Sequence, residues 1–212
     1  MKIIQLIKKV NNTEIGAATT HETYVLVTQG MEVGDIFNET GRVYEFTDKI
    51  LGKRVAARLT VGREKRIVGL GPFYRDHFIS AGDEVVFEKR EGFDSHDSYF
   101  ISVNKFNNRI ILQKNTKGFE ILTPDRLTLI KPDTEIVFEE KRQSISVRFL
   151  LAANKRVDSP EKTNFYSVEI GGESIGDDYK NGDTLELEIA DNLVRFCKEQ
   201  TWKKYVFELE EL

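Results

Sequence analysis

The sequence contains a single cysteine, Cys197, among its 212 residues. One cysteine excludes an intramolecular disulfide and a zinc site built from cysteines, and we expect Cys197 to be a small buried side chain. The three histidines, His21, His77 and His96, have no other histidine or cysteine at a metal-ligand spacing. The composition therefore predicts no metal site, and we expect no cofactor.

Long apolar runs are also absent. The longest, such as residues 149–153, are far too short to cross a bilayer. The first residues, MKIIQLIKKV, return to charge at Lys8 and Lys9 after a very short apolar run, which is not the layout of a signal peptide. Together with the scarcity of cysteine, these absences predict a cytoplasmic protein without a membrane partner.

Most enzyme motifs are missing as well. The sequence has no phosphate-binding glycine loop, no dinucleotide fingerprint, no nucleophile in a recognisable motif and no His-x-Lys pair. One partial match to Mg²⁺-dependent nucleases exists, namely Pro132-Asp133 followed by Glu139-Glu140-Lys141. In one strand, at about 3.3 Å per residue, Asp133 and Glu139 would lie too far apart to share an ion. We therefore predict no catalytic residue, and a complete Mg²⁺-dependent restriction endonuclease with Asp133, Glu139 and Lys141 is kept as an alternative.

Short strands with alternating apolar residues dominate the chain. They are expected over residues 2–10, 23–29, 42–50, 55–61, 83–89, 98–105 and 109–115, and again over 135–140, 144–152, 164–170, 184–190, 193–199 and 204–211. One short helix is expected in PFYRDHF, with Pro72 at its start. We expect His77, at the end of this stretch, to be partly exposed. The pattern predicts a barrel or sandwich rather than alternating strand–helix units.

Two domains are expected, with a boundary near residue 130. Residues 122–134 hold two of the four prolines, and the charge balance changes there. Residues 1–130 carry 19 Lys and Arg against 17 Asp and Glu, whereas residues 131–212 carry 12 against 18. The second domain, 131–212, is thus predicted to be smaller, acidic and β-rich, with an unknown role. Gly182-Asp183 precedes a strand there as Gly82-Asp83 does in the first domain, but two dipeptides do not establish a repeat.

Basic residues cluster between Lys53 and Arg66, where six of them accompany one acid, Glu64. A row of long cationic side chains suits bidentate contact with guanine and point contacts with phosphates. The same row also protects an exposed strand edge from unwanted pairing, so composition leaves both interpretations open. Glu64 either accepts from a cytosine amino group or orients the arginines. Gly69 and Gly71, which follow, are interpreted as turn residues and not as phosphate binders.

A second segment, residues 11–29, joins the first two expected strands. It contains the small polar run Gly16-Ala17-Ala18-Thr19-Thr20, followed by His21-Glu22. Small residues let a backbone approach a surface closely, and Thr and His side chains can donate and accept at base edges. Taken alone, this segment is an ordinary connecting loop.

Together the two segments resemble the DNA-recognition domain shared by restriction endonucleases such as EcoRII, BfiI and NgoAVII, which is related to the plant B-three DNA-binding domain. The resemblance rests on Glu14-x-Gly16-Ala17-x-Thr19-x-His21-Glu22, Arg63-Glu64-x-Arg66-Ile67-x-Gly69-Leu70-Gly71, Tyr74-Arg75-Asp76 and Ala81-Gly82-Asp83-Glu84. It covers roughly residues 1–130. It implies a mainly β fold, a seven-stranded DNA-binding pseudobarrel with one or two short helices, in which an N-arm and a C-arm grip the major groove.

The same resemblance implies sequence-specific recognition of double-stranded DNA, as the target-recognition module of a restriction system with a nuclease domain or subunit as partner. The implied contacts are Thr19, Thr20, His21 and Glu22 in the N-arm and Arg58, Arg63, Glu64, Lys65 and Arg66 in the C-arm, with Lys53 and Lys65 holding phosphates. The family often has Gln where this chain has Glu22, and a Glu lacks the donors of Gln. A protein-binding β module is the remaining alternative.

Overall fold

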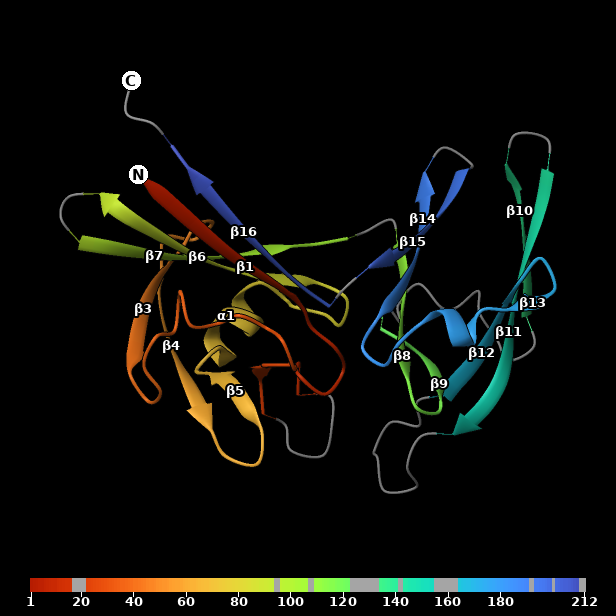
Figure 1. The fold of residues 1–212 in the computed structure, drawn as a ribbon, viewed down its shortest axis with the longest axis horizontal. Helices are drawn as coiled ribbons and strands as arrows, with labels where there is room; N and C mark the ends of the chain where they lie inside the picture. Colours follow the sequence, from red (N-terminus) through yellow and green to blue (C-terminus); the bar gives the residue numbers. More distant parts are fainter. Residues whose placement is uncertain are drawn as a thin grey trace. The chain divides into compact units, whose positions relative to one another are not determined.

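The computed structural model describes residues 1–16, 22–93, 96–106, 109–122, 134–140, 143–154, 164–190, 193–199 and 201–209. The chain is mainly β, as predicted, and divides into two compact units (Figure 1). Unit 1 comprises Met1–Lys105 and Trp202–Leu212, and unit 2 comprises residues 106–201. This division differs from the boundary expected near residue 130. The strand Arg109–Asn115 pairs with the later strand Thr184–Ala190 in unit 2, and the last strand, Trp202–Glu208, pairs with the first strand in unit 1.

The sheet of unit 1 has the strand order β16-β1-β6-β7-β3-β4-β5-β2. Its strands are β1 (Lys2–Lys9), β2 (Tyr24–Leu26), β3 (Val43–Asp48), β4 (Arg54–Val61), β5 (Lys65–Val68), β6 (Glu84–Phe93), β7 (His96–Asn104) and β16 (Trp202–Glu208). Neighbouring strands are antiparallel except β3 and β7, which run parallel. The predicted number of seven strands is wrong for this sheet, because β16 adds an eighth from a segment distant in sequence.

The core of unit 1 lies on one face of this curved sheet. On β3 and β4 every second residue is buried, as the two-residue period of a strand requires. Aromatic rings fill the centre, with Phe37, Phe46 and Phe87 in mutual contact at 5.4–5.6 Å between ring centroids. The alternation visible in the sequence therefore separates the core face from the face that carries the basic side chains.

Helix α1 (Gly71–Asp76) begins at Gly71, and Pro72 lies in its first turn, as predicted. Its Tyr74 hydroxyl donates to the carbonyl of Tyr24 at 3.1 Å, which fastens the helix to β2. His77, which follows the helix, is buried, so the expectation of partial exposure is wrong. Its Nε2 lies 2.5 Å from Oδ2 of the buried Asp48, a partner that the local sequence does not reveal.

The end of β1 is fixed to β2 by the buried side chain of Glu14. Lys8 Nζ donates to both carboxylate oxygens of Glu14, at 2.9 and 3.1 Å, and each side chain is only 1% exposed. The same carboxylate accepts from the N–H of Leu26, and the carbonyl of Glu14 accepts from the N–H of Tyr24. A buried ion pair is retained only where its remaining hydrogen-bonding capacity is satisfied. This network positions the start of the N-arm beside β2.

Unit 2 is also a β structure, with the strand order β10-β11-β12-β9-β8-β14-β15. Its elements are β8 (Arg109–Asn115), β9 (Gly118–Ile121), β10 (Thr134–Glu140), β11 (Gln143–Asn154), β12 (Asn164–Ile170), β13 (Glu173–Ser174), the 3₁₀ turn η2 (Gly176–Asp178), β14 (Thr184–Ala190) and β15 (Leu193–Glu199). The first and last strands of this order, β10 and β15, also lie close to each other.

The two units share one strand order. In unit 1 the path β1-β6-β7-β3-β4-β5-β2 corresponds to β8-β14-β15, then β10-β11-β12-β9, in unit 2. Chain order agrees as well, since α1 precedes β6 and η2 precedes β14. Two junctions between corresponding strands differ in detail. In unit 1, β3 and β7 form a short ladder, whereas the corresponding β10 and β15 of unit 2 only touch. In unit 2, β8 and β9 form a hairpin, whereas the corresponding β1 and β2 of unit 1 are linked by Glu14.

The Gly-Asp turns repeat bond for bond. Gly82 and Gly182 have φ values of 94° and 95°. The N–H of Gly82 donates to the carbonyl of Val10 at 2.8 Å and the N–H of Val10 donates to the carbonyl of Asp83 at 3.0 Å. In unit 2 the same two bonds join Gly182 and Asp183 to Lys114, both at 2.9 Å. The structure therefore establishes the internal repeat that the two dipeptides alone could not.

The repeated units differ most after their first strand. Unit 1 has residues 10–23 between β1 and β2, which include the N-arm, whereas unit 2 turns from β8 into β9 through Thr116 and Lys117. The N-arm that is predicted to contact DNA therefore has no counterpart in unit 2.

The net charges of the two units differ only modestly. Unit 1 contains 17 Lys and Arg against 18 Asp and Glu, and unit 2 contains 14 against 17.

Candidate nucleic-acid interface

The basic cluster lies on the hairpin formed by β4 and β5. The two strands are joined by a tight turn in which the N–H of Gly62 donates to the carbonyl of Glu64 at 3.1 Å. Strand β5 was not predicted, because it is short and two of its four residues, Lys65 and Arg66, are charged. The register pairs Thr60 with Arg66, and the side chain of Arg58 lies on the same face as both. The hairpin thus collects cationic side chains on the face opposite the core.

Arg66 is held in place by two acidic side chains and one ring. Its Nε and Nη2 donate to Oε2 of Glu64, at 3.0 and 2.7 Å. Its Nη1 donates to Oε2 of Glu22 at 3.3 Å, and its guanidinium carbon lies 4.0 Å from the centroid of the Tyr24 ring. Glu64 therefore contacts an arginine, as the second of the two roles open for it requires. Glu22 and Glu64 belong to the predicted N-arm and C-arm, so Arg66 connects the two.

The electrostatics of this cluster keep its charges constant near neutral pH. The hydrogen bond to Glu64 raises the pKa of Arg66 above its already high usual value. Burial raises the pKa of the Tyr24 hydroxyl, against the opposing effect of Arg66. The guanidinium therefore remains a cation and the ring remains neutral, which is the combination that a cation–π contact requires.

Three cationic side chains beside Arg66 project into solvent. Arg58, Arg63 and Lys65 are all exposed. Within the part of the chain that the structure describes, their side chains make no hydrogen bond or ion pair. They differ in this respect from Arg66, which is 28% exposed and bonded to two carboxylates. Cations without a protein partner can accept phosphates or base edges without first breaking an existing contact.

Lys53 lies apart from this group. Its Nζ is 2.6 Å from Oδ2 of Asp76, so Lys53 ties the turn between β3 and β4 to the end of α1. Its neighbour Arg54 is paired with Glu45 across the two strands at 3.0 Å. The structure therefore gives both residues a local partner, in contrast to the three unpaired cations.

The N-arm is described at its two ends. Gly16 has a φ of 79° and follows the Glu14 network, and Glu22 contacts Arg66 at the other end. Thr19, Thr20 and His21 lie outside the described residues. Of the predicted N-arm contacts, the structure thus brings Glu22 to the C-arm and places no other.

Gly69 links the hairpin to α1 and has a demanding backbone position. Its φ is +96°, and a Cβ there would collide with the carbonyl oxygen of Ala56 on β4. Gly69 is therefore a turn residue, as predicted, since only glycine combines this φ with so close an approach. Gly71 has no such φ and opens the helix instead, so the same interpretation is wrong for Gly71.

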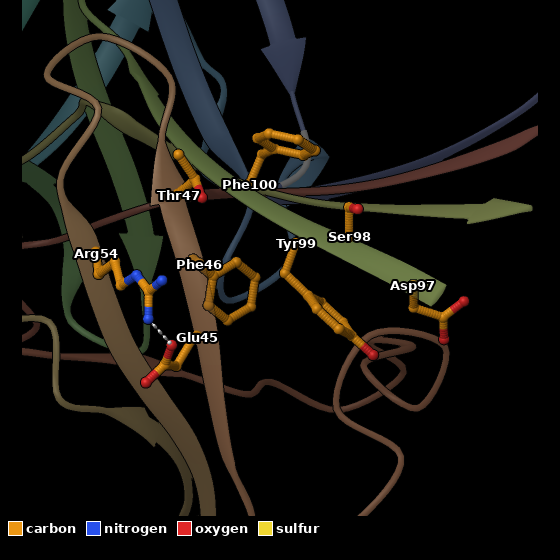
Figure 2. A pocket seen from close by; sticks show the side chains of 8 residues that line it. All are labelled: Glu45, Phe46, Thr47, Arg54, Asp97, Ser98, Tyr99 and Phe100. Atoms are coloured by element: carbon orange, nitrogen blue, oxygen red, sulfur yellow. Dashed lines mark hydrogen bonds and ion pairs between the residues drawn. The ribbon is translucent and has the colours of Figure 1, made fainter. Parts of the chain in front are cut away.

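A shallow hollow of about 260 Å³ lies between β3 and β7 (Figure 2). It forms because their ladder consists only of Thr47 with Phe100 and Asp48 with Ile101. The wall from β3 and β4 carries the Glu45–Arg54 pair, and the wall from β7 carries Tyr99. Because Arg54 and Arg58 share one face of β4, the hollow borders the basic face of unit 1.

Tyr24 belongs to the cluster but was not among the predicted contacts. Its position in the segment after the N-arm was the available signal. Because side chains alternate between the two faces of a strand, Tyr24 lies on the same face of β2 as Leu26. The register sets Leu26 opposite Arg66, and no local pattern predicts that pairing.

No group of His, Cys, Asp or Glu in the described residues could hold a metal ion. For the alternative nuclease site, Glu139 is in β10, whereas Asp133 and Lys141 lie outside the described residues. No helix in the described segments has the length and apolar character needed to span a membrane.

No family model matches the chain, and no curated protein matches it. Among solved structures it is similar to the N-terminal domain of Helicobacter pylori LlaJI.R1, with 11% sequence identity and a TM-score of 0.34. This likeness covers 50% of the present chain and 83% of that one.

Proposed function

We propose that unit 1 recognises double-stranded DNA in a sequence-specific manner, with the β4–β5 hairpin and the segment ending at Glu22 as the two contacting arms. The observation that carries the proposal is the Glu22–Arg66–Glu64 cluster on Tyr24. It joins the two arms that the sequence resemblance names, which lie 44 residues apart in the chain at Glu22 and Arg66. The three unpaired cations on the same hairpin supply the positive charge that DNA binding needs.

Each residue has a distinct part in this proposal. Arg63 and Arg58 read or contact the DNA directly, because their guanidinium groups are exposed and have no hydrogen bond or ion pair to any of the described residues. Lys65 holds a phosphate as a point charge. Arg66 has five N–H groups, and its contacts with Glu64 and Glu22 use three of them. Two remain for a bidentate contact with guanine, so Arg66 is a reader whose orientation is set before DNA arrives.

The wider role we propose is that of a target-recognition module in a restriction system, with double-stranded DNA as partner and the cutting carried out by a nuclease domain or subunit. Unit 2 repeats the strand order of unit 1 without the arm, so we assign the DNA contact to unit 1 alone. The proposal includes Thr19, Thr20 and His21 as N-arm contacts on the ground of the sequence resemblance. Lys53 belongs at the edge of the interface, where it can exchange Asp76 for a phosphate.

The decisive experiment is selection of bound duplexes from a random library with the full chain, followed by a salt titration on the selected site. We expect one enriched sequence and an affinity that falls linearly with the logarithm of salt concentration. An affinity that does not respond to salt, with no enriched sequence, would instead favour a protein-binding β module. The same duplexes incubated with Mg²⁺ test the nuclease alternative, which requires cleavage that is lost in Glu139→Ala.

A further inference from the structure

Strand β16 forms an open edge of the unit 1 sheet. It pairs with β1 without interruption, from Trp202 opposite Lys8 to Glu208 opposite Lys2. Met1 and Leu209 extend the ladder through reciprocal backbone bonds of 3.0 and 2.9 Å. Because β16 ends the strand order, none of the described strands pairs with its other edge. Such an edge presents a row of backbone donors and acceptors to any strand that approaches.

This edge lacks the usual protection against pairing. It has no proline, and its register shows no bulge. Lys204, which could guard the edge, is instead bound to Glu32 and Asp35 of the same unit. Its exposed side chains are mostly apolar: Tyr205 43%, Val206 48%, Phe207 45% and Leu209 48%. The rings of Tyr205 and Phe207 are stacked on one face, with centroids 6.2 Å apart.

The internal repeat explains how this edge arises. In unit 2, β8 pairs with β14 on one side and with β9 on the other. In unit 1, β1 pairs with β6 on the equivalent side, and β16 takes the remaining side. β16 therefore occupies the side of β1 that corresponds to the side of β8 paired with β9 in unit 2. The open edge of the unit 1 sheet is consequently that of β16.

We propose that the open edge of β16 pairs with β16 of a second copy of this chain, which makes the protein a twofold-symmetric dimer. A twofold axis perpendicular to the sheet makes the two strands antiparallel. With the axis at Val206, the sequence YVF is complementary to itself, because Val206 faces Val206 of the second copy and Tyr205 faces Phe207. Paired aromatic rings and paired β-branched residues are cross-strand neighbours that stabilise an antiparallel ladder.

This dimer does not depend on the proposed DNA function, and its test measures mass alone. Static light scattering during size-exclusion chromatography, over a hundredfold range of concentration, gives the mass of the full chain. We expect twice the monomer mass of 24.4 kDa for the wild type. Val206→Lys and Val206→Glu each place like charges across the axis and are expected to run as monomers. Ile50→Lys is the control, because Ile50 is 61% exposed and lies outside β16.

Mixing the two variants makes the test specific for this register. Lys at position 206 of one copy would face Glu at position 206 of the other, so an equimolar mixture is expected to recover the dimer mass. Misfolded variants would not recover in this way. A monomeric wild type across the whole concentration range overturns the proposal, as does a Val206→Lys variant that stays dimeric or a mixture that stays monomeric.

Discussion

The guanidinium of Arg66 lies over the ring of Tyr24, with 4.0 Å between its central carbon and the ring centroid. Tyr24 belongs to β2 and Arg66 to β5, and the ladder between these strands sets the two residues on one face. Glu64 fixes the rotation of the guanidinium plane through two hydrogen bonds to one oxygen. A long flexible side chain is thereby confined before any ligand is present, which reduces the entropy lost on binding.

Arg63→Ala is expected to weaken binding to the selected DNA site by about 1–3 kcal/mol, because it removes an exposed and unpaired guanidinium. Fluorescence anisotropy on the selected and a scrambled duplex measures the change. Arg148→Ala is the matched control, since Arg148 is 47% exposed on β11 of unit 2 and should leave affinity unchanged. Equal losses in the two variants would place the interface outside the hairpin.

Glu64→Gln is expected to reduce discrimination between the selected and scrambled duplexes by about 1–3 kcal/mol, because Arg66 loses the carboxylate that orients it. Stability should change by less than about 1 kcal/mol, since the pair is close to the surface. Competition binding measures the first quantity and urea unfolding the second. Glu45→Gln, which removes the exposed partner of Arg54, is the control. Unaltered discrimination would show that Arg66 does not read a base.

Gly69→Ala is expected to destabilise the protein by about 1–3 kcal/mol, because the new methyl group combines a positive φ with a clash against the carbonyl of Ala56. The urea midpoint of the full chain reports the loss. Gly34→Ala serves as the comparison, as Gly34 has open space around it and no positive φ. A midpoint equal to that of Gly34→Ala would contradict the backbone geometry assigned to Gly69.

Acid is expected to weaken unit 1 through the buried pair of Asp48 and His77. Burial acts to raise the pKa of Asp48, but the bonds from His77 and from the N–H groups of Ile50 and Leu51 lower it below its usual value. The stabilisation from Asp48 is therefore complete above about pH 4, where the unfolded carboxyl is ionised, and disappears as pH falls through the lower folded pKa.

Asp48→Asn is accordingly expected to lower stability at neutral pH by about 1–3 kcal/mol and to flatten the acid side of the stability profile. Urea midpoints between about pH 3 and pH 7 measure both effects. Asp76→Asn, which changes a more exposed carboxylate paired with Lys53, should keep the wild-type slope. An unchanged acid limb in Asp48→Asn would mean that another group controls the transition.

Local patterns in the sequence predict most strands and the helix, because alternation and Pro72 act within a few residues. They miss β5, whose short run from Lys65 to Val68 begins with two charges and gains its partners from β2 and β4. They also miss the burial of His77, which depends on Asp48, 29 residues earlier. The basic cluster is visible in the sequence, but the division between the engaged Arg66 and the unpaired Arg63 requires the register of the hairpin.

The pairing of β1 with β16 also sets the order of events during synthesis. The bonded termini of this ladder, Met1 and Leu209, are separated by 208 positions. On the ribosome, β1 emerges long before β16, and β16 cannot cover its outer edge until the whole of unit 2 has been made. Unit 1 therefore completes its sheet only after unit 2 has been translated, and until then a chaperone or a neighbouring nascent chain has access to the edge of β1.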